Sequence, residues 1–147
     1  MIAQLNVART IAPLDAPEMA EFTNNLDRIN QLAEQAEGFV WRLKDDSGNA
    51  TAMRFFEDEN VVLNLSVWQS VAALRDFTFE TDHKYFVKHR RRWFHAYEGR
   101  SFVLWPIDDP AIMPSAEAAF ARLAALEDRG PSAFAFDWKT ASDFEDA

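Results

Sequence analysis

Residues 61–68 read Val-Val-Leu-Asn-Leu-Ser-Val-Trp, and this stretch decides the fold. Its odd-numbered positions are all apolar, whereas its even-numbered positions mix apolar and polar side chains, an alternation typical of a strand. The mixed row consists of Val62, Asn64, Ser66 and Trp68. Ser70 follows as a helix N-cap, ahead of apolar residues at helical spacing up to Phe77. The stretch therefore predicts a strand, a turn and a helix.

The segments on either side continue the pattern. Residues 2–7 predict a strand with Ile2, Gln4 and Asn6 on one side and apolar residues on the other. Asp15, with Glu18 three positions later, predicts a capped helix start. The other expected elements, in chain order, are a helix to about residue 36, strands at 39–43 and near 51–56, a helix at 81–96, a strand at 102–105, a helix at 116–128 capped by Ser115, a strand at 133–138 and a frayed end at 142–147.

This element order predicts an α+β protein with one domain over residues 1–147. Its first six elements, β-α-β-β-α-β, match a ferredoxin-like antiparallel sheet with helices on one face, and a C-terminal helix and strand extend it. We expect the mixed face of the sheet to be the one without helices. There the sheet of a second subunit would cover it and leave a lined cavity. The alternative is that these polar side chains simply bond to neighbours or to solvent.

Composition excludes several classes of function. The chain has 15 Lys and Arg against 24 Asp and Glu, a net charge of −9, which argues against nucleic acid as a partner. It has no Cys and only 4 Gly, so it has no disulfide, thiolate metal site or Gly-rich phosphate loop. Neither a membrane-length apolar run nor a leader segment is visible, which predicts a cytoplasmic protein. The spacing of its His residues predicts no metal site.

His83 is the titratable residue of greatest interest because it lies among aromatic residues. It is a candidate general base, since its ordinary pKa of about 6.5 is close to neutral pH. It is also a candidate axial ligand of haem iron, or a structural His bonded to Asp82 or to the backbone. The basic run Lys88–Arg92 is spread around a helix, which predicts a solvated face. One Arg of that run could still meet an anionic ligand.

Several segments resemble the dimeric α/β-barrel superfamily, which includes antibiotic-biosynthesis-type and haem-degrading monooxygenases. They are Asn6, Glu37-Gly38-Phe39, residues 65–70, residues 73–77 and His83. The chain is more similar still to an uncharacterised bacterial family known only as a domain of unknown function. The segments that carry this second resemblance are residues 3–6, 38–43, 64–68 and 91–94. The superfamily resemblance implies a homodimer in which Asn6, Trp68 and His83 form the catalytic site.

Three functions are therefore expected. The first is a small-molecule-binding, monooxygenase-like enzyme that acts on a planar aromatic substrate without a cofactor. The residues expected to contact that substrate are Gln4, Asn64, Ser66, Trp41, Arg42 and Arg91. The second is a haem-binding protein that uses His83. The third is a non-catalytic dimeric sensor or interaction module.

Overall fold

The protein is described by a computed structural model that covers residues 1–44, 61–81, 83–95, 100–109 and 111–144. The strand expected near residues 51–56 lies outside these ranges. In chain order the elements are β1 Ile2–Thr10, η1 Pro17–Met19, α1 Ala20–Gln35, β2 Phe39–Arg42, β3 Val61–Trp68, α2 Val71–Glu80, α3 His83–Lys88, η2 Arg90–Arg92, β4 Phe94–His95, β5 Phe102–Pro106, α4 Ala116–Arg129 and α5 Ala141–Phe144.

All strand pairs of the sheet are antiparallel, and β1 lies at its centre. β3 runs along one edge of β1 and carries β2 on its far side. The other edge of β1 pairs with β5 through residues 2–6 and with β4 through residues 9–10. The order β2-β3-β1-β5 is that of a ferredoxin-like sheet, so the predicted α+β class and topology are confirmed.

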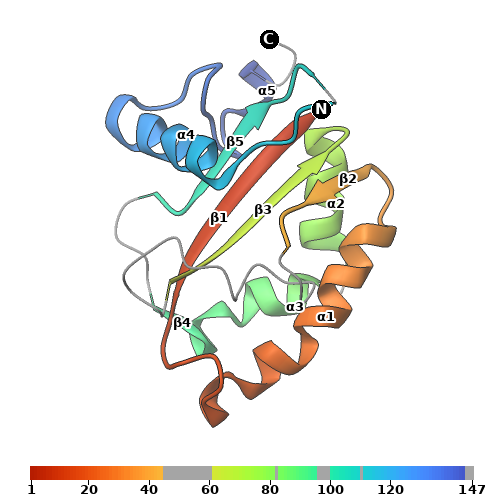
Figure 1. The fold of residues 1–147 in the computed structure, drawn as a ribbon, viewed down its shortest axis with the longest axis vertical. Coiled ribbons are helices and arrows are strands. Elements are labelled where there is room, and N and C mark those ends of the chain that lie inside the picture. Colours follow the sequence, from red (N-terminus) through yellow and green to blue (C-terminus); the bar gives the residue numbers. More distant parts are fainter. Residues whose placement is uncertain (45–60, 82, 96–99, 110, 145–147) are drawn as a thin grey trace.

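Each face of the sheet is covered by helices of the chain itself. On one face, Leu5, Leu65 and Val103 pack with Ala119 and Leu126 of α4. On the other face, Trp68 and Leu104 pack with apolar residues of α1 and α2. Figure 1 shows α4 beside β5, well apart from α1 and α2. The expectation of helices on one face only is therefore wrong, because the C-terminal extension covers the second face.

The face under α1 and α2 is the mixed one. It carries four polar residues in two cross-strand pairs, Gln4 opposite Ser66 and Asn6 opposite Asn64, and we call it the polar face. The prediction that a sister subunit's sheet covers this face is wrong, since α1 and α2 of the same chain lie over it. Dimer formation itself stays a prediction, now without this reason for it.

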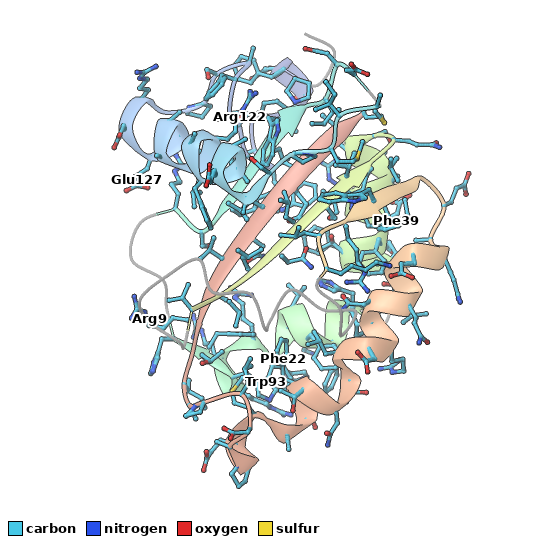
Figure 2. All side chains as sticks on the ribbon, viewed as in Figure 1. Arg9, Phe22, Phe39, Trp93, Arg122 and Glu127 are labelled. Atoms are coloured by element: carbon cyan, nitrogen blue, oxygen red, sulfur yellow. The ribbon has the colours of Figure 1, made fainter. Side chains whose placement is uncertain are left out.

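The helix expected over residues 81–96 ends at Lys88. A 3₁₀ turn follows, and then β4 pairs Phe94 with Thr10 of β1. Trp93 is 2% exposed and packs against the rings of Phe22 and Phe86. Figure 2 shows Phe22 of α1 beside Trp93. Burying this indole and pairing the next residues with β1 require an extended backbone, which a continuing helix does not provide.

The strand expected at residues 133–138 is reduced to one bridge. Phe136 exchanges both backbone hydrogen bonds with Leu104, at 2.8 and 2.9 Å, and is fully buried. After it, the Asp137 carboxylate accepts hydrogen bonds from the amide and the hydroxyl of Thr140. That turn chemistry stops the strand and leads into α5, where the sequence predicted only a frayed end.

Helix starts were predicted with mixed success. Ser70 and Ser115 cap α2 and α4 as expected, each accepting a hydrogen bond from the third residue along. Asp15 caps no helix, because the 3₁₀ turn η1 precedes α1 and neither has a side-chain cap. Pro17 at the start of η1 takes over this role, since its ring fixes a helix-compatible φ and it lacks the amide hydrogen that a cap would bind.

Candidate functional site

A hydrogen-bonded row of polar side chains crosses from β1 to β3 on the polar face. The Gln4 amide nitrogen donates to Asn64 Oδ1 and, at 2.7 Å, to Ser66 Oγ. Ser66 Oγ also accepts a 2.9 Å hydrogen bond from the Trp68 indole nitrogen. Gln4 thus uses both amide hydrogens and Ser66 both of its acceptor positions. This network fixes the orientation of all four side chains.

The network changes in exposure along its length. Gln4, Ser66 and Trp68 are buried, whereas Asn64 and its cross-strand partner Asn6 are exposed. Gln4 occupies Asn64 Oδ1, and within the described residues no acceptor is bonded to the two amide hydrogens of Asn64, which can therefore donate to another group. The polar face therefore ends in two neighbouring exposed amides, of which Asn64 is held by the buried part of the network.

Trp68 belongs to a row of aromatic rings beneath α2. Phe39 meets it edge-on at 5.4 Å, and Phe77 stacks on it at 5.2 Å between ring centroids. Phe77 in turn contacts the His83 ring at 5.1 Å. Trp68 is only 1% exposed, so in this structure it is part of the core and supports the site through Phe77 and Ser66. The contact of Phe77 with both Trp68 and His83 could not be predicted from the sequence, where Phe77 is one of several apolar residues at helical spacing.

His83 has a defined tautomer and is neutral at pH 7. Its Nδ1 lies 3.2 Å from the carbonyl oxygen of Thr78, and since a carbonyl only accepts, the proton must be on Nδ1. Nε2 then carries the free electron pair. Desolvation lowers the pKa of His83 below 6.5, and the Thr78 hydrogen bond only partly opposes this shift. Of the two predicted partners for a structural His, the backbone is observed, and Asp82 lies outside the described residues.

Of the other three expected contact residues, Trp41 and Arg91 lie away from this group, whereas Arg42 is the cross-strand partner of Ser66. Trp41 packs on the opposite face of the sheet, against the core under α4. Arg42 forms a 2.8 Å ion pair with Glu34 of α1. Arg91 is exposed on the 3₁₀ turn after α3. The structure thus brings together Gln4, Asn6, Asn64, Ser66 and Trp68, and links His83 to them through Phe77.

Neither of two surface grooves among the described residues is lined by any of the three predicted catalytic residues. One, of about 340 Å³, runs along β2 beside Glu34 and Arg42. The other, of about 380 Å³, lies beside β5 and the segment after Phe136. In the same part of the chain, no group of three or more His, Asp or Glu side chains could hold a metal ion. Haem ligation by His83 stays a prediction to which this geometry adds nothing.

The sheet order and helix placement define a ferredoxin-like α+β protein, and comparison with solved structures agrees. A single-residue mutant of SnoaB, a cofactor-independent oxygenase from Streptomyces nogalater, matches with a TM-score of 0.51 and 17% identity over 74% of this chain and 93% of that chain. A structural-genomics protein, YJCS, matches 74% of this chain and 100% of its own, at 11% identity and a TM-score of 0.49. At 17% identity, the SnoaB match shows a shared fold alone.

The chain belongs to the family described as "Domain of unknown function (DUF3291)", whose profile matches residues 1–147. The predicted resemblance to an uncharacterised family of this fold is thereby confirmed. A search of curated proteins finds no match. In the part of the chain that the structure describes, no helix has the length and apolar character needed to cross a membrane.

Proposed function

We propose that this protein binds a planar phenolic molecule at the exposed end of the polar face and oxidises it without a cofactor. The observation that carries the proposal is the hydrogen bond from Gln4 to Asn64 Oδ1, which leaves the amide nitrogen of this exposed residue as its remaining polar group. Asn6 lies directly opposite on β1 and is exposed as well. Two amides at cross-strand distance fit the oxygen atoms of a hydroxylated ring system.

Preorganised donors favour a substrate whose oxygen becomes negatively charged during the reaction. The buried support of Asn64 means that its amide does not have to reorient when the charge develops, which is the basis of oxyanion stabilisation. Ser66 and Trp68 act as positioning residues here, since they reach Asn64 only through Gln4. The proposed role of Trp68 is thus support and not a wall of the site.

His83 is the proposed general base. It is uncharged at neutral pH, and its Nε2 lone pair is available because Nδ1 binds the Thr78 carbonyl. Proton removal from a ring carbon gives a carbanion stabilised by the phenol, and O₂ adds to it as a hydroperoxide. Loss of water leaves a ketone. The carbon exchanges two hydrogens for one oxygen atom, the second oxygen leaves as water, and the substrate supplies all four electrons.

The fold shared with SnoaB supports this reading, because that protein is described as a cofactor-independent oxygenase. The test is oxygen consumption by the purified protein with a tricyclic hydroxyanthrone, measured above the uncatalysed rate. We expect His83→Ala to lower kcat by roughly 100-fold or more, as for other general bases. His89→Ala, in the residue after α3, is the matched control and should keep full activity.

The outcomes separate the proposed enzyme from other functions. Substrate binding without oxygen uptake would overturn the oxygenase and favour a non-catalytic sensor. Oxygen uptake that is unchanged in His83→Ala would overturn the role of this residue. Asn64→Ala should raise KM and lower kcat together, since its amide is proposed to bind the oxygen in both the ground state and the transition state.

A further inference from the structure

A second feature lies on β5 and the segment that follows the Phe136 bridge. It is a shallow groove of about 380 Å³ lined by Arg100, Ser101, Phe102, Asp137, Trp138 and Lys139. Phe102 is the register partner of Asn6, so the groove adjoins the polar face without including the network described above. None of its lining residues takes part in the proposed oxidation.

The floor of the groove is aromatic. The rings of Phe102 and Trp138 lie nearly parallel, 14° apart, with centroids separated by 5.1 Å. Phe79 of α2 contacts Trp138 at 5.7 Å and is itself 41% exposed. Half-buried rings at a groove offer apolar contact to a flat ligand.

The charged groups around this floor are three cations, Arg100, Lys139 and Arg75, and two carboxylates, Asp137 and Glu127, the latter bonded to the Arg100 amide at 2.7 Å. Burial opposes ionisation of Asp137, but hydrogen bonds from Thr140 and Arg100 outweigh it and lower its pKa. Arg100 neutralises this carboxylate through a 2.7 Å ion pair. Lys139 is exposed, and Arg75 lies 5.4 Å over the Trp138 ring. Neither of these two cations forms an ion pair within the described residues.

We infer that this groove binds an aromatic carboxylate, with its ring packed against the stacked pair of Phe102 and Trp138 and its carboxylate at Lys139. Arg100 bonds Asp137 through one guanidinium nitrogen, and within the described residues its other guanidinium N–H groups have no acceptor and can bind the ligand carboxylate. The chain as a whole has a net charge of −9, which makes a locally cationic aromatic groove selective for anions that also carry a ring. This inference concerns binding only and does not rest on the proposed oxidation.

The test is calorimetric titration of the full chain with 2-naphthoate, compared with the uncharged 2-naphthamide. We expect the naphthoate to bind roughly tenfold more tightly than the amide, and Lys139→Gln to weaken its binding about fivefold, the scale of one exposed charge pair. Trp138→Leu should abolish binding. Arg129→Gln, at the end of α4, is the matched loss of an exposed cation elsewhere and should change nothing.

Equal affinity for the naphthoate and the naphthamide would overturn the inference. So would naphthoate binding that is unaffected by Lys139→Gln, a substitution of an exposed side chain that leaves the fold intact. His83→Ala should bind naphthoate normally, so loss of oxidation and loss of this binding are separate results. Circular dichroism of Trp138→Leu shows whether its loss of binding reflects the groove or a loss of fold.

Discussion

Replacing Ser66 by Ala tests the buried network directly. Ser66 is 5% exposed, and its hydroxyl oxygen accepts from both the Trp68 indole and the Gln4 amide. The substitution leaves the indole N–H without a partner, at a cost of about 1–3 kcal/mol, and removes one further hydrogen bond worth about 1 kcal/mol. We therefore expect the free energy of unfolding to fall by about 2–4 kcal/mol.

The assay is urea unfolding followed by circular dichroism, with Ser70→Ala as the matched control. Ser70 is exposed and only caps α2, so its loss should cost about 1 kcal/mol. A Trp68→Phe variant has no indole N–H that could lose its acceptor. In that background, the loss of unfolding free energy caused by Ser66→Ala should be smaller by at least about 1 kcal/mol. Equal costs for Ser66→Ala in the two backgrounds would refute the reasoning that the network holds Trp68.

Three further predictions concern backbone conformation, burial and pH. Gly38→Ala should destabilise the fold by about 2 kcal/mol or more in urea unfolding, because φ is +87° and the new carbon would lie 2.5 Å from a side chain of α2. Gly130→Ala has open space around it, and its cost of about 1–3 kcal/mol should come from the backbone alone, because φ of +79° with ψ of −178° is a region that glycine alone adopts readily. Phe136→Ala, at a fully buried position, should lower the unfolding free energy by about 3–5 kcal/mol. Phe134→Ala, at a 47% exposed position, should lower it by less than about 1 kcal/mol. Equal losses of unfolding free energy in the two variants would contradict the difference in burial. Burial lowers the pKa of His83, so as the pH falls the unfolded chain takes up the His83 proton at a higher pH than the folded chain. The contribution of His83 to stability should therefore be full above pH 6.5 and decline as the pH falls through the folded pKa. Unfolding free energies measured between pH 5 and 8 should vary less with pH for His83→Gln, and an unchanged pH dependence would refute the burial of a neutral His83.

The sequence by itself determined the elements whose signals are local. β3 begins and ends where its alternation predicts, and Ser70 and Ser115 begin their helices, because strand period and N-capping depend on neighbouring residues alone. The alternation also placed Gln4, Asn6, Asn64 and Ser66 on one face, since register in a sheet keeps alternate residues together.

Tertiary structure decided which helices cover that face, and no local signal carries this information. The alternation of β3 fits helices on either face of the sheet. The packing of α1 and α2 against Trp68, and of α4 against Leu65, decides which helices cover which face. The burial of Trp93 likewise ended a helix that its own sequence would continue. The tautomer of His83 was equally hidden, because it depends on the Thr78 carbonyl, which only the turn between α2 and α3 brings to the ring.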